Sequence, residues 1–551
     1  MYCDVSATLR RRLRGCLASA EDAYMNIRLR IAGFGAATLL IATGITAAGF
    51  GAPGLAAPAF AGSGRAAASV RVSVAGTDRA GKSVRVTAFA DTGQDAPIRL
   101  NAKPRTIDAG QYWIGATVTT PAGGNTSYSQ TLVVRHVTIT RSQTVVLDAR
   151  PGKLVQVSLG VPGAANDGNG VQACLSGGQS GLWQESGRAG ALYVVPVAGR
   201  HMTFGYSSTW QTSSATYYLA QEAAGGIPRQ PVYHVAPRGL AKENLVLRSG
   251  TTTSGYQDWF LQRQFPGKCD IDELSLPTAA TPSRSTAYLS PGSWQFEVFA
   301  TGSSWQGTRE LAAGRSYTNT FGAAVFGPGT YYPTLDFGQL GYFPEEPFGD
   351  PLQPAGDECC DRSSISLSLN GQTLKHQTMT EYKATRSFSY RLHSAGWYTM
   401  HVESSRYVPG KRLPARMLSS SESTTWRFYV SAQYATLDSV MMPVTATRYV
   451  PQGLDLENRA PAGPATRINV SVLLASEPGW TSHSYPLKTI SVQASFDGGA
   501  HWRNVRLVRE GGHWVAFVPA PAAGYVALRS TVTDVRGDST VQTIYRAYQI
   551  R

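Results

Sequence analysis

Short runs of alternating apolar and polar residues, separated by turn residues, constrain the fold of this chain most strongly. Val70 to Val74 and Val84 to Phe89 alternate with a period of two, and the turn-rich segment 76–81 lies between them. Successive side chains of a strand point to opposite faces, so this period predicts half-buried strands joined in a hairpin. The 57 glycines and 31 prolines supply frequent turns. Beyond residue 61, no stretch keeps a helical i, i+3, i+4, i+7 pattern over three turns.

We therefore expect an all-β chain of serial β-sandwich domains behind an N-terminal signal peptide. At about 100–200 residues per domain, the part of the chain after residue 61 holds three or four domains. The linker-like segment 459–464 precedes the last of them. The expected regions are a leader and signal peptide over 1–61, a small sandwich over 66–150, an aromatic-rich region of one or two sandwiches over 151–340, a β region that begins with an acidic Pro/Gly loop over 341–465, and a last sandwich over 466–551.

Residues 25–61 have the layout of a secretory signal. Arg28 and Arg30 precede the apolar run 31–50, and Ala59-Phe60-Ala61 forms an A-x-A end. The run is poor in leucine, whereas a stable membrane span needs about 20 strongly apolar residues. We therefore expect cleavage, with an uncleaved anchor as the alternative, and no membrane span in the mature chain. The expected location is secreted, either extracellular or associated with a cell wall.

Four cysteines follow the signal segment: Cys174, Cys269, Cys359 and Cys360. An even number in an exported chain favours disulfides and leaves three possible connectivities. A bond between the neighbours Cys359 and Cys360 is geometrically strained, so we expect these two to reach different partners.

Charge and composition narrow the classes of partner. The formal net charge is +14, but the basic residues are scattered along the chain. Because nucleic-acid sites are typically clustered basic patches, we expect no nucleic-acid partner. Diffuse positive charge suits an acidic cell wall or another anionic polymer, and the expected partner is a cell-wall polymer or an extracellular protein. The nine histidines show no H-x-x-x-H spacing, so the sequence predicts neither a metal site nor a cofactor.

No complete catalytic motif is present. Asp91-Thr92-Gly93 has the letters of a catalytic aspartate motif, and segment 178–182 resembles a nucleophile elbow without its second glycine. A hydrolytic triad needs a nucleophile and a histidine base beside the aspartate. We therefore expect no enzyme. The alternative, a hydrolase of unrecognised type, predicts a serine and a histidine within hydrogen-bond reach, or two carboxylates in a cleft.

Clustered aromatic residues are the remaining candidate for a binding site. Trp210, Tyr217 and Tyr218 lie close in sequence. Exposed rings of this kind bind sugars by stacking, which makes the three a candidate carbohydrate platform. The alternative is that they fill a sandwich core, as Trp294 and Phe296 are expected to do because they share one strand face.

The last region carries the features of a recognisable module. Segment 491–502 combines a strand, a tight turn and Trp502, and nearly matches an Asp-box hairpin. Asp boxes recur once per blade in propellers, so a single copy predicts a hairpin turn in a sandwich. Two strand-like segments follow, over 526–534 and 542–548.

Segments 146–150, 317–328 and 454–464 agree with this module in their order along the chain. Together these pieces resemble the non-catalytic C-terminal tail of large secreted actinobacterial subtilisin-like serine peptidases. The first sandwich is similar to the carboxypeptidase-regulatory type and the last to a fibronectin or Ig-like sandwich. The chain departs from that family because the catalytic domain is absent. The resemblance implies a non-catalytic binding or accessory module, with a carbohydrate- or cell-wall-binding protein as the alternative.

Overall fold

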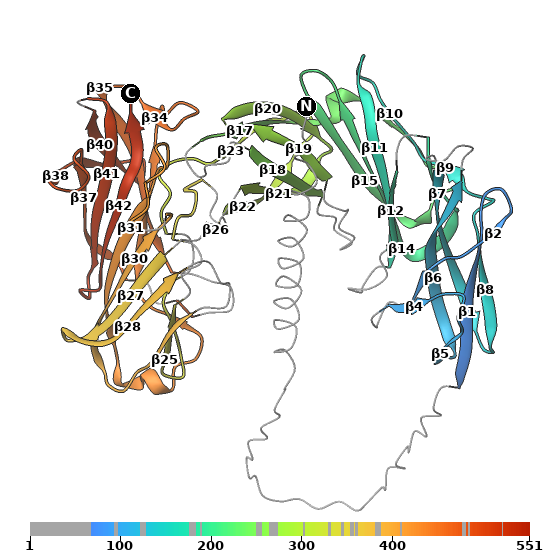
Figure 1. Cartoon of the computed structure of the whole chain (residues 1–551), viewed down its shortest axis with the longest axis horizontal. Coiled ribbons are helices and arrows are strands. Elements are labelled where there is room, and N and C mark those ends of the chain that lie inside the picture. Colours follow the sequence, from blue (N-terminus) through green and yellow to red (C-terminus); the bar gives the residue numbers. More distant parts are fainter. Residues whose placement is uncertain are drawn as a thin grey trace, which may run out of the picture. The chain divides into compact units, whose positions relative to one another are not determined.

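The structure is all-β, as the sequence predicted (Figure 1). This computed structural model describes residues 68–551 apart from 93–96, 122–127, 176–182, 188–189, 250–255, 264–273, 281, 301–302, 329–331, 343–346, 353–356, 359–361, 381–386, 408–409, 476–480, 483–484 and 521. The expected signal peptide lies outside the described residues. The two helices of the described part are short 3-10 turns, η1 (Pro237–Gly239) and η2 (Ala432–Ala435). Neither they nor any other described segment forms a helix long and apolar enough to cross a membrane.

The first sandwich packs a four-stranded sheet against a six-stranded sheet. The four-stranded sheet comprises β1 (Ser69–Thr77), β2 (Ser83–Val84), β5 (Arg105–Asp108) and β8 (Gln143–Asp148). The six-stranded sheet has the order β4-β3-β6-β7-β13-β9 and comprises β3 (Ala88–Asp91), β4 (Ile98–Leu100), β6 (Gly110–Pro121), β7 (Tyr128–Ile139), β9 (Lys153–Leu154) and β13 (Leu192–Val194). Val72, Val74, Ile114 and Val118 belong to the core between them.

The predicted hairpin is present, since Gly76 on β1 pairs with Val84 on β2. The strand expected over 84–89 is divided, however. β2 ends at Val84 in the four-stranded sheet, and β3 begins at Ala88 in the six-stranded sheet. The chain therefore crosses from one layer to the other in the middle of the alternating run.

The middle of the chain forms a seven-stranded sheet, a five-stranded sheet and a two-stranded ribbon. The seven-stranded sheet has the order β12-β11-β14-β15-β20-β17-β23 and comprises β11 (Ala165–Leu175), β12 (Trp183–Gly187), β14 (Val197–Gln211), β15 (Thr216–Ile227), β17 (Ala241–Leu247), β20 (Ser283–Leu289) and β23 (Ser316–Phe321). The five-stranded sheet comprises β18 (Tyr256–Arg263), β19 (Leu274–Ala280), β21 (Gly292–Ala300), β22 (Ser303–Leu311) and β26 (Asp357–Glu358). The ribbon pairs β10 (Gln156–Leu159) with β16 (Val232–Val235).

The C-terminal part contains three sheets. A second five-stranded sheet comprises β24 (Thr334–Asp336), β25 (Gln339–Tyr342), β29 (Phe388–Arg391), β32 (Val440–Met441) and β36 (Thr481–Ser482). A nine-stranded sheet has the order β28-β27-β30-β31-β42-β41-β37-β38, with β34 also on β42, and comprises β27 (Arg362–Leu369), β28 (Gln372–Thr380), β30 (Gly396–Ser405), β31 (Ser421–Val430), β34 (Arg459–Ala460), β37 (Leu487–Ser495), β38 (Arg503–Asn504), β41 (Gly524–Asp534) and β42 (Ser539–Ile550). A second four-stranded sheet comprises β33 (Thr445–Pro451), β35 (Gly463–Leu474), β39 (Arg506–Glu510) and β40 (His513–Ala520).

The nine-stranded sheet joins segments that are far apart in sequence. β42 pairs with β41 on one side and with β31 on the other. Segment 459–464, which we expected to be a linker, contains β34 and the start of β35. Strands from both sides of position 465 therefore share one sheet.

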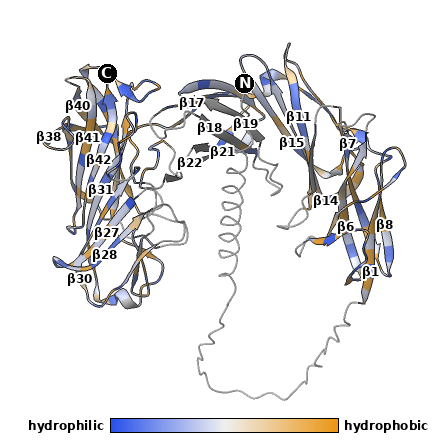
Figure 2. Cartoon of the chain, in the orientation of Figure 1, coloured by the Kyte–Doolittle hydropathy of each residue, from blue (hydrophilic) through white to orange (hydrophobic). Residues whose placement is uncertain are grey.

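The cores follow the period-two pattern along the strands. Figure 2 shows hydrophobic and hydrophilic residues interspersed along them. One face of the nine-stranded sheet carries Ile365, Met400 and Trp426. These residues pack in a core that also contains Leu335 and Leu340 of the second five-stranded sheet. Because side chains alternate between faces, the intervening residues of those strands point away from that core.

Candidate functional site

The face of the nine-stranded sheet opposite its core is a continuous polar surface, which we call the outer face. Cross-strand pairing aligns its side chains in rows that run perpendicular to the strands. The first row runs through Asn504, Gln493, Arg529, Thr543, Ser423, Glu403, Ser364 and Thr378. The second runs through Ser491, Thr531, Val541, Thr425, His401, Ser366 and His376. The third runs through Thr489, Thr533, Ser539, Arg427, Thr399, Ser368 and Thr373.

Val541 is the single apolar residue in these three rows. The side chains of Glu403 and His401 are 63% and 38% exposed, and Arg427 is also exposed. A broad sheet face that carries hydroxyl, amide, imidazole and guanidinium groups offers many hydrogen-bond donors and acceptors to a ligand. The Ser-Ile-Ser-Leu-Ser alternation over 364–368 is the sequence signal that indicates such a face.

One arginine of the outer face stacks on the tryptophan of the Asp-box hairpin. The Arg529 guanidinium carbon lies 3.9 Å from the centre of the Trp502 ring. Its Nε donates a hydrogen bond to Thr543 Oγ1 at 3.1 Å. The stacking and the hydrogen bond together fix the plane of the guanidinium group.

The hairpin that carries Trp502 is stabilised from within. Ser495 Oγ accepts a hydrogen bond from the Gly499 amide at 2.9 Å, and Asp497 Oδ1 accepts one from the His501 amide at 2.9 Å. The His501 amide, the Ser495 hydroxyl and the His501 ring all hydrogen bond to Asp497, and these bonds hold the pKa of its carboxyl well below its usual range. The local geometry agrees with the predicted hairpin turn in a sandwich, because β37 pairs with β38 across it.

A second arginine stacks on a second tryptophan of the outer face. The Arg427 guanidinium carbon lies 3.8 Å from the centre of the Trp397 ring, and Nη1 donates to the Gly537 carbonyl at 3.2 Å. Tyr429 packs edge-on against Trp397 with 5.5 Å between ring centres. The two arginines are thus held by the same kind of contact, on different strands of one face.

A line of three groups on β30 and β31 of the outer face resembles a catalytic relay. Glu403 Oε1 is 3.2 Å from His401 Nε2, and His401 Nδ1 is 2.8 Å from Thr425 Oγ1. Thr425 is in the middle of β31, which pairs with β30 on one side and β42 on the other. These ladders use the backbone N–H groups that would otherwise stabilise an oxyanion. The line therefore orders the side chains of the face, and the described strands around Thr425 present no preformed oxyanion hole.

A serine and a histidine also meet on the two-stranded ribbon. Ser158 Oγ lies 2.5 Å from His234 Nδ1, and both side chains are exposed. Within the described residues, no carboxylate hydrogen bonds to the other ring nitrogen of His234. The described part of the chain therefore shows no orienting group of a triad at this histidine. Asp91, whose motif has catalytic letters, is 2% exposed at the end of β3.

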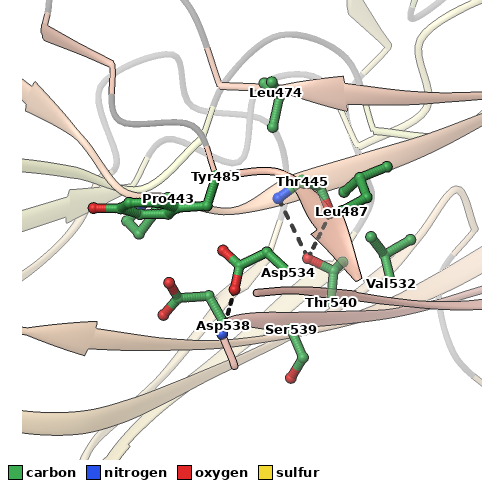
Figure 3. A pocket seen from close by; sticks show the side chains of 10 residues that line it. All are labelled: Pro443, Thr445, Leu474, Tyr485, Leu487, Val532, Asp534, Asp538, Ser539 and Thr540. Carbon is green, nitrogen blue, oxygen red and sulfur yellow. Dashed lines mark hydrogen bonds between the residues drawn. The ribbon is translucent and has the colours of Figure 1, made fainter. Parts of the chain in front are cut away.

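A narrow pocket lies on the core side of the nine-stranded sheet, near the β41–β42 turn (Figure 3). Asp534 Oδ1 accepts the Asp538 amide at 3.0 Å, and Asp538 Oδ1 accepts the Tyr429 amide at 2.9 Å. Burial, with a contribution from the negative charge of Asp534, raises the pKa of Asp538 to about 6. The carboxyl pair connects the turn to β31. Across the described part of the chain, no three His, Cys, Asp or Glu side chains gather as a metal site.

The predicted aromatic platform is not an exposed one. Tyr217 and Tyr218 are 8% and 0% exposed. Tyr217 stacks on Tyr288 with 4.9 Å between ring centres, and Trp210 Nε1 donates to Ser208 Oγ at 2.8 Å within a partly buried setting. Tyr217 and Tyr218 are thus core residues, as the alternative interpretation expected, and Trp210 is partly buried against the core that contains Tyr217. Trp294 and Phe296, 0% and 1% exposed, are core residues as expected.

Of the four predicted disulfide residues, Cys174 is in the described part. It is a buried, disulfide-bonded residue near the end of β11. Cys269, Cys359 and Cys360 lie outside the described residues, as does the elbow-like segment 178–182.

Comparison with known proteins adds no family. No family model and no curated protein match the chain. Among solved structures, the chain is similar to Sidekick-1 immunoglobulin domains 1–5, with 11% identity, a TM-score of 0.11, and coverage of 86% of this chain and 95% of that one. It is also similar to Escherichia coli alpha-2-macroglobulin activated by porcine elastase, with 9% identity, a TM-score of 0.13, and coverage of 88% of this chain and 53% of that one. At these TM-scores neither likeness bears on function.

Proposed function

We propose that this chain is an extracellular, non-catalytic binding module that contacts a carbohydrate polymer of a cell wall through the outer face. The observation that carries this proposal is the set of three continuous polar rows across the nine-stranded sheet. The signal-like segment 25–61 and the resemblance to a peptidase tail without its catalytic domain support the extracellular and accessory parts of the proposal.

The chemistry of the face favours a sugar polymer over a protein partner. Protein interfaces typically have an apolar, aromatic-rich centre. The middle of the outer face instead carries serine and threonine hydroxyl groups. Its aromatic rings, Trp397 and Trp502, are stacked on arginines. Neighbouring strands are about 4.8 Å apart, so hydroxyl and amide groups recur at short, regular spacing across the sheet. A chain of sugar rings presents hydroxyl groups in a similarly repeated way.

Co-sedimentation with insoluble cell-wall polysaccharide tests this function. The wild-type mature chain is expected to sediment with the polymer. The double variant Ser423→Leu/Thr531→Leu, which removes two hydroxyls and adds bulk to the rows, is expected to remain largely in solution. Ser471→Leu changes an exposed serine on the second four-stranded sheet and is the matched control. Equal sedimentation of the double variant and the wild type would refute the assignment of the outer face.

Hydrolysis is the second candidate function, and the Glu403–His401–Thr425 line is the observation in its favour. Esterase, peptidase and glycosidase assays on the purified mature chain are expected to be silent, because Thr425 lies between paired strands without a free oxyanion site. Turnover by the wild type that disappears in Thr425→Ala would replace the binding proposal with a catalytic one.

A further inference from the structure

The outer face carries an excess of positive charge at defined positions. Arg427 and Arg529 lie in its rows, and Arg362 extends it on β27, where it pairs with Ser405. Glu403 is the single carboxylate in the three rows, and it is already engaged by His401. A surface with this excess of positive charge attracts anions. A neutral polysaccharide would leave the arginines without a negatively charged partner.

The two stacked arginines are preorganised for an anion. Arg529 is held by Trp502 and Thr543, and among the described residues its two terminal nitrogens have no hydrogen-bond partner. Arg427 is held by stacking on Trp397 and by the hydrogen bond from its Nη1 to the Gly537 carbonyl. Within the described part of the chain, its Nη2 has no hydrogen-bond partner. A planar guanidinium group with free N–H groups binds a carboxylate in a bidentate manner. Side chains already fixed by stacking lose little further entropy when they bind.

The spacing of the two arginines points to a polymer. Arg529 is level with Thr543 and Ser423 across the strands, and Arg427 lies four residues beyond Ser423 on β31. Two strand spacings and four residue rises place the two positions about 16 Å apart. A small anion cannot bridge that distance, whereas one chain with repeated charges engages both arginines and gains from the second contact. On β31 the Ser423 hydroxyl lies at the level of Arg529, and the Thr425 hydroxyl lies between the two levels.

We infer that the outer face binds a carboxylate-bearing polysaccharide, a polyuronate, with Arg427 and Arg529 as two separate carboxylate sites and the hydroxyl rows as contacts to the sugar rings. This inference rests on the proposed function and names its ligand class.

Affinity electrophoresis against polygalacturonate and its fully methyl-esterified form tests the inference, because esterification removes the carboxylate charge and leaves the sugar backbone unchanged. We expect the wild type to bind polygalacturonate at least tenfold more tightly, and this preference to shrink as salt is raised. Arg427→Gln and Arg529→Gln are each expected to weaken polygalacturonate binding severalfold, and the double variant to abolish the preference. Arg427→Lys and Arg529→Lys, which keep the charge but lose the bidentate fork, are expected to fall between.

Matched variants separate the outer face from general basicity. Arg509→Gln removes an exposed arginine that faces Trp514 on the second four-stranded sheet, 5.9 Å from the ring centre, and is expected to bind as the wild type does. Glu403→Gln removes the carboxylate of the rows and is expected to bind polygalacturonate more tightly.

Four outcomes would contradict the inference, and the last of them would also contradict the proposed function. Equal binding of the two polymers would refute the polyuronate assignment and leave the binding function standing. Tighter binding to a poly(glycerol phosphate) or to RNA than to polygalacturonate would refute the carboxylate class. An effect of Arg509→Gln as large as that of Arg529→Gln would refute the location. No binding to any polysaccharide would refute the proposed function itself.

Discussion

Buried ionisable residues set the pH dependence expected of this chain. The side chain of Glu243 on β17 is 0% exposed, and Oε1 lies 3.4 Å from Arg309 Nη1. In the described structure Oε2 has no hydrogen-bond partner. Burial outweighs the attraction of Arg309 and raises the pKa of Glu243 to about 7. The folded state therefore holds a proton that the unfolded state releases near pH 4.5.

A raised carboxyl pKa in the folded state stabilises the protein below the unfolded pKa, and this contribution is lost as pH rises through the folded value. We expect the free energy of unfolding to fall between about pH 4.5 and pH 7 in the wild type. Glu243→Gln keeps the shape and removes the charge, so it is expected to stabilise the protein by roughly 1–3 kcal/mol at pH 8.

Urea unfolding of both proteins at pH 5 and pH 8 measures this effect. Asp148→Asn is the control, because Asp148 is partly exposed beside Arg150 and that hydrogen bond lowers its pKa. If Glu243→Gln shows the same loss of stability with rising pH as the wild type, Glu243 is not the titrating group.

At the scale of elements, the hairpin between β37 and β38 depends on two adjacent glycines with positive φ. Gly499 has φ 96°, and a Cβ there would lie 2.8 Å from Tyr545 Cε1. Gly498 has φ 71°, and a Cβ there would meet nothing within 4 Å. The two positions share the backbone requirement and differ in the space beside them.

Gly499→Ala is expected to cost about 2–4 kcal/mol, because left-handed strain and a clash with Tyr545 add together. Gly498→Ala is expected to cost about 1–2 kcal/mol from the strain alone. Chemical denaturation of the two variants measures the difference. Equal losses would show that Tyr545 moves aside without cost and that the close packing of the hairpin does not matter.

The position of Cys174 in its sheet predicts its disulfide partner. Cys174 on β11 lies opposite Thr203 on β14, which lies opposite Ala224 on β15. Glu222, two residues from Ala224, is within electrostatic reach of Arg263, the last residue of β18. Cys269 follows Arg263 by six residues in the sequence.

Cys359 and Cys360 instead follow Glu358, which pairs with Ser303 at the start of β22. Arg309, which aligns with Arg263 across β21, lies near the other end of β22. We therefore expect Cys174 to pair with Cys269, which replaces the expectation that Cys359 and Cys360 reach different partners, because those two are then left with each other. Non-reducing peptide mapping is expected to show a Cys174–Cys269 peptide. Alkylation of all four without reduction would contradict the disulfides, and a Cys174–Cys359 peptide would contradict the pairing.

At the scale of the whole molecule, the C-terminal sheets depend on strands from well before residue 466. β42 pairs with β31 along Ser421 to Arg427, and β35 pairs with β33 along Thr445 to Pro451. A fragment 466–551 lacks both partners. The edges of β42 and β35 would then expose unpaired backbone groups and apolar side chains.

We expect the fragment 466–551 to lack cooperative unfolding, whereas 332–551, which retains the partner strands, unfolds cooperatively. Circular dichroism melts and the dispersion of amide resonances distinguish the two. A well-dispersed spectrum and a sharp melt for 466–551 would show that the last region folds by itself and that its pairing with β31 is dispensable.

The fold class and several local elements follow from the amino-acid sequence without reference to tertiary contacts. Alternation over 70–74, the turn at 76–81 and the Ser495-to-Trp502 hairpin could be predicted because period, turn residues and hairpin chemistry are local properties. The same local rules predicted that Trp294 and Phe296 share a buried face. They also indicated that Trp210, Tyr217 and Tyr218 were candidates for either a core or a surface.

Which strands pair, and which sheet faces remain exposed to solvent, depends on long-range packing. A period of two assigns a residue to one of two faces, but not to a partner strand or to the solvent side. β42 pairs with β31, which precedes it by more than a hundred residues in the sequence. This pairing places Arg529 and Arg427 on one outer face. The stacking of Arg529 on Trp502 and the burial of Tyr218 likewise depend on long-range packing, which local sequence does not encode.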